Sequence, residues 1–205
     1  MNKLYYAPGA CSIGIHVLLE EIGKPYLAEQ VDLRAPAPQR TYTLKNPKSK
    51  VPALEREDGS LLTEFPAIAF WLARSNPEAG LLPDDIDGQA RALEALDFAV
   101  STVHMRSYTL MNRPGNFTPD EAAHDAVKAR GRENFDKGLA ILNTALDGKD
   151  YVLGRFSIAD AALFYVEFWA SRANVPLPAN CAAHFARMKA RPAVAAVLKK
   201  EGFDA

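Results

Sequence analysis

The sequence predicts an α/β domain followed by an all-helical domain. Strand-like and helix-like segments alternate up to about residue 75. A stretch rich in proline, glycine and aspartate then runs from Asn76 to Gly88, as is usual between domains. Beyond this stretch the pattern is helical, and no segment is a convincing strand. We therefore place one domain at residues 1–80 and an all-helical domain at residues 87–205.

The first domain opens with a strand, a turn and a helix. Residues 3–6 are expected to form the strand, and Ala7-Pro8-Gly9 the turn that follows it. The spacing of apolar residues predicts an amphipathic helix that starts at an N-cap, Ser12, and stops at Gly23. Its apolar positions are Ile15, Leu18, Leu19 and Ile22.

Three further strands are expected in this domain. The second strand is predicted over residues 26–33, before an irregular proline-rich crossing at residues 35–38. Residues 51–57 and 60–62 are predicted as two strands joined by a two-residue turn at Asp58-Gly59. The sheet is therefore expected to be parallel in its first half and antiparallel in its second half.

All remaining predicted elements are helices. The first covers residues 64–73 and has Phe70 and Trp71 available for burial. A second is predicted over residues 89–111. Thr118-Pro119-Asp120-Glu121 has the pattern of a capping box, so a long helix is expected from there to about Leu146.

The C-terminal part is predicted to hold three more helices. Ser157-Ile158-Ala159-Asp160 has a second capping signature, which opens an apolar helix. Two shorter helices are expected at residues 181–189 and 192–200.

Composition excludes several classes of protein. The 205 residues carry 24 Lys and Arg against 25 Asp and Glu, so the basic excess of a nucleic-acid-binding protein is absent. An apolar fraction of 48% excludes disorder, and two cysteines, Cys11 and Cys181, cannot build a disulfide framework. The early uncharged stretch from Leu4 to Leu19 falls short of the ~20 apolar residues of a membrane span. We expect a soluble, cytoplasmic protein without nucleic-acid or membrane partners.

Cys11 is the residue best placed for chemistry. It precedes the predicted N-cap Ser12, where free backbone N–H groups and the helix dipole favour an anion and therefore a thiolate. The alternative is a small buried hydrophobe, because cysteine is among the most buried residue types. Ser12-Ile13-Gly14 follows, so the second cysteine of a redox C-x-x-C motif is absent, and a mixed disulfide with an external thiol stays open.

Three other positions are weaker candidates. Val51-Pro52 suits an ordinary strand start, whereas a cis bond there would present the Val51 backbone to an extended peptide. Thr63-Glu64-Phe65-Pro66 marks a helix N-terminus with a carboxylate for an ammonium group, although acidic first turns are common. His104 lies in mid-helix, where a lone histidine is more often structural. The histidines and cysteines have no zinc spacing and no glycine-rich phosphate loop is present, so neither metal nor nucleotide is expected.

Four ordered motifs resemble those of the bacterial beta-class glutathione transferases, and the resemblance covers essentially the whole chain. The motifs are Leu4-Tyr5-Tyr6-Ala7-Pro8-Gly9-Ala10-Cys11-Ser12, Asn46-Pro47-Lys48-Ser49-Lys50-Val51-Pro52-Ala53-Leu54, Leu62-Thr63-Glu64-Phe65-Pro66-Ala67-Ile68 and Ser157-Ile158-Ala159-Asp160-Ala161. The resemblance implies the glutathione transferase fold, a thioredoxin-like N-terminal domain followed by an all-α C-terminal domain. It also implies a homodimer that holds glutathione mainly in the first domain.

The resemblance further implies roles for single residues. Cys11 matches the active-site cysteine, and His104 a histidine that reaches the site within a segment starting at Ser101. Val51 matches the residue whose backbone pairs with the cysteinyl part of glutathione, and Pro52 matches the cis-proline that follows this residue. Glu64 and Phe65 match the two residues that bind the γ-glutamyl end. Asp97 matches a position that reaches glutathione bound by the partner subunit. Ser157 and Asp160 match a structural capping box.

Three departures weaken the implied glutathione contacts. Phe65 stands where the family usually has Gly or Ser, which leaves only its backbone N–H for a carboxylate. Pro36 and Met105 stand where relatives often carry Lys. The Lys at the position of Pro36 commonly contacts the glycine end of glutathione, and the loss of that charge-assisted contact costs roughly 1–3 kcal/mol. The residues that could compensate are Arg34, Arg40 and Arg106.

The leading hypothesis is a detoxifying transferase that conjugates the glutathione thiol to small hydrophobic electrophiles, with glutathione as co-substrate and no metal. One alternative is a glutathione-dependent thiol-disulfide or peroxide reductase that works through a mixed disulfide of Cys11. Another is a non-catalytic ligand-binding or stress protein of the same fold. The electrophile pocket is expected along the loop after Tyr6 and residues 101–111, including Tyr108.

Overall fold

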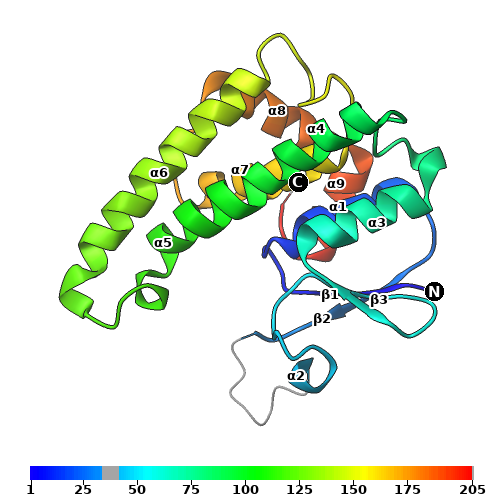
Figure 1. The fold of residues 1–205 in the computed structure, drawn as a ribbon, viewed down its shortest axis with the longest axis horizontal. Coiled ribbons are helices and arrows are strands. Elements are labelled where there is room, and N and C mark those ends of the chain that lie inside the picture. Colours follow the sequence, from blue (N-terminus) through cyan, green and yellow to red (C-terminus); the bar gives the residue numbers. More distant parts are fainter. Residues whose placement is uncertain (34–41, 205) are drawn as a thin grey trace. The chain divides into compact units, whose positions relative to one another are not determined.

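The structure, a computed structural model, describes residues 1–33 and 42–204. The chain forms two compact units (Figure 1). The first combines Met1–Leu82 with the C-terminal residues from Met188 onward, and the second is Pro83–Arg187. The C-terminal helix thus belongs with the α/β unit, which differs from the division proposed from the sequence; that division stays a prediction. The proline-rich crossing predicted at residues 35–38 lies outside the described residues.

The first unit contains a mixed sheet. Its elements are β1 (Lys3–Tyr6), α1 (Ser12–Ile22), β2 (Leu27–Gln30), α2 (Tyr42–Lys45), β3 (Ala53–Glu55), β4 (Leu61–Thr63), α3 (Phe65–Ser75), the 3-10 turn η1 (Pro77–Ala79) and α9 (Pro192–Lys200). Within the described ranges the strands form a four-stranded sheet in the order β2-β1-β3-β4. β1 pairs with β2 in parallel, and the β1–β3 and β3–β4 pairs are antiparallel. The predicted change from parallel to antiparallel pairing is confirmed.

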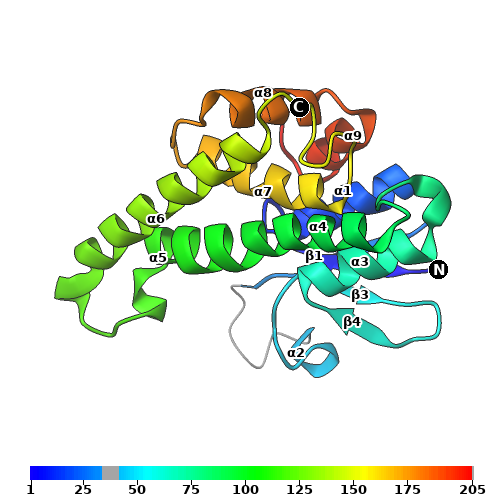
Figure 2. The ribbon, with the colours of Figure 1, turned by 45° about the horizontal axis from the view of Figure 1, so that its top comes forward.

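Successive residues of β1 point to opposite faces of this sheet. The Tyr5 ring packs against Tyr42 of α2, with ring centroids 5.3 Å apart. The Tyr6 ring instead meets His16 of α1 at 5.1 Å. Figure 2 accordingly shows α1 and α3 on one side of the sheet and α2 on the other. Helix α9 packs on α1, where Arg191 Nε lies 2.7 Å from Glu21 Oε1.

The strands are shorter than predicted, and the hairpin between β3 and β4 has a different loop. The N–H of Arg56 donates to the carbonyl of Ser60 at 2.8 Å, and the N–H of Gly59 donates to the carbonyl of Arg56 at 2.9 Å. Gly59 has φ 81°, which glycine adopts without a steric penalty. A turn closed by a left-handed glycine is typical of three-residue loops, so the predicted two-residue turn is wrong.

The starts and faces of two helices also correct the sequence interpretation. The N-cap of α1 is Cys11, and Ser12 is the first helical residue. The Ser12 hydroxyl is bonded to the backbone of Ala7 at 3.3 Å, so it does not cap α1. In α3, Phe70 lies on the outer face and is 36% exposed, so its expected burial is wrong.

The second unit is helical throughout its described elements. These are α4 (Ile86–Asp97), η2 (Phe98–Tyr108), α5 (Thr109–Asn112), η3 (Pro114–Asn116), η4 (Glu121–Ala123), α6 (His124–Ala145), α7 (Ile158–Arg172) and α8 (Ala179–Lys189). Helix α4 continues without a break into η2, which is π-helical, and then into α5. The predicted helix at residues 89–111 is therefore present, but its π-helical middle was not predicted.

The two capping signatures have different outcomes. Ser157 and Asp160 form the predicted capping box of α7, in which the Ser157 N–H donates to Asp160 at 2.8 Å. The predicted start at Thr118 is wrong, because Asp120 accepts the Ala122 N–H at 3.0 Å and caps the short turn η4. Helix α6 begins only at His124. No helix in residues 1–33 and 42–204 is long and apolar enough to cross a membrane.

Candidate functional site

Cys11 stands at the junction between β1 and α1, as the strand-turn-helix pattern predicts. Its side chain is half-buried and is not in a disulfide. The Sγ–H group donates to the carbonyl of Val51 at 3.4 Å. This bond uses the thiol proton of Cys11.

The helix N-terminus beside Cys11 offers fewer free donors than the sequence suggests. The N–H of Ile13 donates to the carbonyl of Ala10 at 3.0 Å, and the N–H of Gly14 to the carbonyl of Cys11 at 3.1 Å. These two groups are among the first N–H groups of α1, which usually stay available for an anion. The helix dipole remains as an electrostatic aid to an anion at this end.

The Val51-Pro52 peptide bond is cis. The interpretation as an ordinary strand start is therefore wrong, and the cis form that the resemblance implies is present. The residue before Val51 is held firmly, because the Lys50 carbonyl accepts the Tyr42 hydroxyl at 2.8 Å and the Asn46 amide at 2.9 Å. The backbone of Val51 is therefore fixed where Cys11 meets it.

Glu64 joins β4 to α3 with a positive φ of 71°. Positive φ is uncommon for residues other than glycine and is often found at functional sites. Ala53 pairs with Thr63 across the β3–β4 ladder. Pro52, just before β3, and Glu64, just after β4, therefore lie at the same end of the hairpin. Phe65 begins α3 with its side chain buried, so the backbone is what this residue can offer a ligand.

The Glu64 carboxylate is paired with a lysine in this structure. Lys48 Nζ lies 2.6 Å from Glu64 Oε1 and also donates to the Thr63 hydroxyl at 2.8 Å. Both partners of the ion pair are more than half exposed, so opening it costs little, about 0–1 kcal/mol. Lys48 belongs to one of the four motifs, but its sequence position alone gave no sign of this pairing.

The other predicted residues belong to the second unit. Ser101 donates to Asp97 Oδ2 at 3.3 Å, one turn apart where α4 enters the π-helix. His104 lies in the π-helix with its Nδ1 3.3 Å from the Tyr165 hydroxyl and its ring edge-on to Trp169, 4.6 Å between centroids. A site built from both sets of residues stays a prediction.

His104 has an unusual environment. Burial, with Arg113 as a secondary cause, lowers its pKa to about 4. The imidazole is therefore neutral near pH 7, and it can act as a hydrogen-bonding group but not as a cation. Tyr108, one turn further on, stacks on Trp169 at 4.7 Å and gives this face its aromatic character.

Comparison with known proteins settles the family. The chain matches the family models described as "Glutathione S-transferase, N-terminal domain" over residues 9–75 and "Glutathione S-transferase, C-terminal domain" over residues 125–200. It is 38% identical to the glutathione S-transferase GstA of Escherichia coli O157:H7, with 98% of both chains covered. The chain belongs to the glutathione S-transferase family.

Solved glutathione S-transferase structures agree with this. A sphingomonad glutathione S-transferase complexed with glutathione is 36% identical, with a TM-score of 0.83 and 98% of both chains covered. A bacterial beta-class glutathione S-transferase from Sphingomonas chungbukensis is 33% identical, with a TM-score of 0.82 and the same coverage. The expected resemblance to the beta class, the fold and the enzyme class are therefore confirmed.

One contact that holds the loop between β1 and α1 was not predicted from the sequence. The Glu201 carboxylate, directly after α9, accepts the N–H of Gly9 at 2.9 Å and lies 2.8 Å from His16 Nδ1. It thus holds the turn that leads to Cys11 from a point 192 residues further along the chain. No local pattern could have indicated this contact.

Of the two positions where relatives often carry Lys, the structure describes Met105 but not Pro36. Met105 is 49% exposed in the π-helix. Pro36, Arg34 and Arg40 lie outside the described residues. In the part of the chain that the structure describes, no group of His, Cys, Asp and Glu side chains is placed to hold a metal ion.

Proposed function

We propose that this glutathione transferase conjugates glutathione to small hydrophobic electrophiles. The observation that carries the proposal is the grouping in the first unit: Cys11 touches the Val51 carbonyl beside cis-Pro52, and Glu64 follows at the same end of the β3–β4 hairpin. Glu64 would take the γ-glutamyl ammonium group, with Lys48 displaced, and the Phe65 N–H would take the neighbouring carboxylate. The Val51 backbone would pair with the cysteinyl residue, which brings the glutathione sulfur towards Cys11.

In the conjugation step, the glutathione thiol loses its proton to solvent and its sulfur forms a bond to the electrophilic carbon. The leaving group departs with the electron pair of the bond that breaks. Cys11 supports the thiolate by donating its S–H, once the ligand draws that group away from the Val51 carbonyl. We further propose a cytoplasmic homodimer in which Asp97 reaches the glutathione of the partner subunit. His104 contributes a neutral hydrogen-bonding group, and Ser101 lines the same face.

A second candidate is reduction of mixed disulfides. It is favoured by Cys11 itself, a partly exposed thiol that is not in a disulfide, whereas Cys181 is buried. The Cys11 thiolate would attack the disulfide of a glutathionylated substrate, forming Cys11–glutathione disulfide and releasing the substrate thiolate. A second glutathione would then restore Cys11 and leave as glutathione disulfide.

Three variants separate the two reactions. Cys11→Ala should abolish disulfide reduction, whereas Cys11→Ser keeps a donor for the Val51 carbonyl and should retain most conjugation of chlorodinitrobenzene. Cys181→Ala is the matched control and should leave both activities unchanged. Equal loss of conjugation in Cys11→Ser and Cys11→Ala would contradict the role of the Cys11 S–H group as a donor to the glutathione thiolate.

Glutathione binding is tested separately. Calorimetry should detect binding to the wild-type protein and a loss of about tenfold or more in affinity for Glu64→Gln, because a charge-assisted hydrogen bond is removed. Absence of both turnover and binding would reject the proposal. Binding without turnover would leave the ligand-binding protein that the sequence kept as an alternative.

A further inference from the structure

A single buried side chain, that of Asn46, organises the loop that leads to Val51. Asn46 is 1% exposed, and its side-chain N–H groups donate to the Lys50 carbonyl at 2.9 Å and to the Tyr42 hydroxyl at 3.0 Å. Its side-chain oxygen accepts the backbone N–H of Lys48 at 3.1 Å. The backbone of Lys48 is therefore fixed relative to Val51.

The side chain of Lys48 reaches from this loop to the end of the β3–β4 hairpin. Its Nζ lies 2.6 Å from Glu64 Oε1 and donates to the Thr63 hydroxyl at 2.8 Å. An ammonium group has three N–H donors, so one donor of Lys48 is unused among the described residues. Glu64 Oε2 likewise has no partner in the part of the chain that the structure describes. The side chains of Lys48 and Glu64 are 54% and 65% exposed, so a ligand can reach both.

The charges of Lys48 and Glu64 match the head of an α-amino acid. The two side chains present a cation and an anion in contact, and an α-amino acid head carries an ammonium group and a carboxylate on one carbon atom. Complementary charges at short range select a partner largely because a mismatched partner leaves a charge unpaired. Phe65, the residue after Glu64, cannot meet a ligand carboxylate with its side chain, whereas Lys48 can.

The hydrogen bond to Thr63 keeps Lys48 within reach when its ion pair opens. Once a ligand ammonium group takes Glu64, the Lys48 ammonium loses its carboxylate partner but keeps the Thr63 hydroxyl. Exposed ion pairs are weak, so this opening costs little. A carboxylate on the carbon atom that carries the ligand ammonium group would restore a charge-assisted hydrogen bond to Lys48. The exchange replaces one ion pair by two and leaves no charge unpaired.

We propose that Lys48 determines specificity for the γ-glutamyl group. As the ammonium group of glutathione takes Glu64, Lys48 takes one oxygen of the α-carboxylate and the N–H of Phe65 takes the other. The site therefore selects thiols with a zwitterionic head over thiols that carry only one of the two charges. This inference rests on the proposed binding of glutathione and gives Lys48 a role of its own in it.

Two ligands that differ in one group test the proposal on the full-length protein. Glutathione has the α-carboxylate, whereas γ-aminobutyryl-cysteinylglycine lacks it and keeps the ammonium group. Calorimetry should show that the wild-type protein binds glutathione about tenfold more tightly than this analogue. In Lys48→Met the preference should fall to about twofold, because only glutathione loses a contact. The analogue should bind the variant at least as tightly as the wild type, because the competitor for Glu64 is gone.

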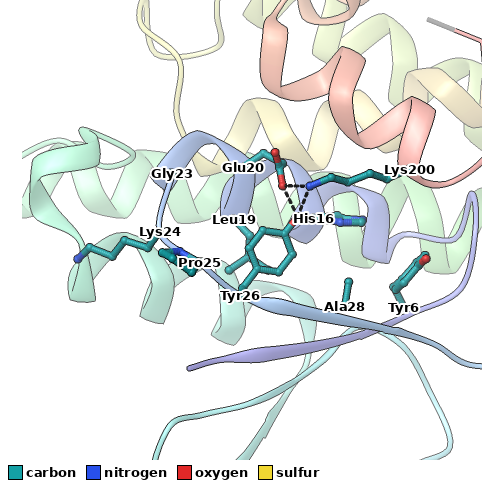
Figure 3. A pocket seen from close by; sticks show the side chains of 10 residues that line it. All are labelled: Tyr6, His16, Leu19, Glu20, Gly23, Lys24, Pro25, Tyr26, Ala28 and Lys200. Atoms are coloured by element: carbon teal, nitrogen blue, oxygen red, sulfur yellow. Dashed lines mark hydrogen bonds and ion pairs between the residues drawn. The ribbon is translucent and has the colours of Figure 1, made fainter.

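Two further variants serve as controls. Lys48→Arg keeps a cation that binds carboxylates and should keep most of the preference. Lys24→Met removes a lysine of similar exposure, 60%, from its pair with Glu78, in which Nζ lies 2.8 Å from Oε1. Figure 3 shows Lys24 beside Pro25 in the wall of a cavity that Glu64 does not line. Lys24→Met should leave both affinities unchanged.

Steady-state kinetics give an independent readout. The contact to Lys48 lies at the γ-glutamyl end of glutathione, away from the reacting sulfur. Lys48→Met should therefore raise the KM for glutathione about fivefold and change kcat by less than about twofold. An unchanged KM would overturn the proposal, even where the analogue binds too weakly for calorimetry.

The preference between the two ligands separates the roles that Lys48 could have. If Lys48 merely competes for Glu64, both ligands bind Lys48→Met more tightly and the preference stays at about tenfold. If Lys48 is merely structural, both bind more weakly by the same factor. Either result would overturn the inference and leave the proposed function intact. Absence of glutathione binding to the wild-type protein would instead reject the proposed function, and the inference with it.

Discussion

At the scale of single residues, the environment of each histidine decides its chemistry. His104 is half-buried against Tyr165 and Trp169, and burial lowers its pKa to about 4. We expect its ring protons in the NMR spectrum to titrate with a midpoint near pH 4, assigned by their absence in His104→Asn. A midpoint between about pH 6 and 7, the range of an exposed histidine, would contradict the assigned burial.

Glu201 allows a second prediction at this scale. Glu201→Ala leaves both the Gly9 N–H and His16 Nδ1 without an acceptor, which should lower the free energy of unfolding by about 2–4 kcal/mol. Glu201→Gln keeps an acceptor oxygen and should lose less. Urea unfolding of the two variants provides the measurement, and equal losses would show that the hydrogen bond to Gly9 contributes nothing.

At the scale of elements, the close approach of α6 to the preceding helical stretch depends on two glycines. A Cβ atom on Gly131 would lie 2.4 Å from the Met111 backbone nitrogen, which cannot move away easily. On Gly138 it would lie 2.9 Å from a methyl group of Val103, which can rotate. The π-helix places Val103 at this contact, and α5 places Met111.

These contacts predict different outcomes for the same substitution. Alanine is favoured over glycine in a helix by about 1 kcal/mol, so Gly138→Ala should be nearly neutral. Gly131→Ala should instead destabilise the protein by roughly 1–3 kcal/mol, as overpacking against a rigid backbone does. The midpoints of urea unfolding check both values. Indistinguishable midpoints for the two variants would mean that α5 moves away from α6 freely.

The elements also show how far the sequence could predict this fold. Helices whose signals are local were predicted well: the capping box of Ser157 and Asp160 and the final helix at residues 192–200 are present as expected. The π-helix was missed because an apolar spacing does not distinguish it from an α-helix. The proposed site residues rest on ordered motifs alone and stay a prediction. The Glu201 contact and the Lys48–Glu64 pair join residues that no local pattern relates.

At the scale of the whole molecule, a formal net charge of −1 conceals ionisable groups buried in the second unit. His184 Nδ1 lies 2.8 Å from Glu167 Oε2, and Nε2 lies 3.3 Å from Asp160 Oδ1, with all three side chains inaccessible to solvent. Burial alone would lower the pKa of His184, but the adjacent carboxylates of Asp160 and Glu167 prevail and raise it to about 9. Burial raises the pKa of Glu167 to about 7, although His184 opposes this.

Both shifts make the folded protein bind more protons than the unfolded chain. The stability from His184 is complete below its unfolded pKa of about 6.5 and is lost as pH rises through about 9. The stability from Glu167 is complete below about 4.5 and is lost as pH rises through about 7. The two contributions have the same sign, so the cluster stabilises the fold less and less from acid to alkaline pH. For His184 the change amounts to about 3 kcal/mol.

We therefore expect the free energy of unfolding to fall by about 3–5 kcal/mol between pH 6 and pH 9.5. Urea unfolding across this range measures it, and His184→Gln should remove most of the slope, whereas His124→Gln should preserve it. If His184→Gln does not fold, as the loss of a buried charge partner can cause, NMR titration of His184 in the wild-type protein gives the same information. A midpoint below pH 7 for His184, or stability that rises towards pH 9, would show that the carboxylates do not hold the imidazolium form.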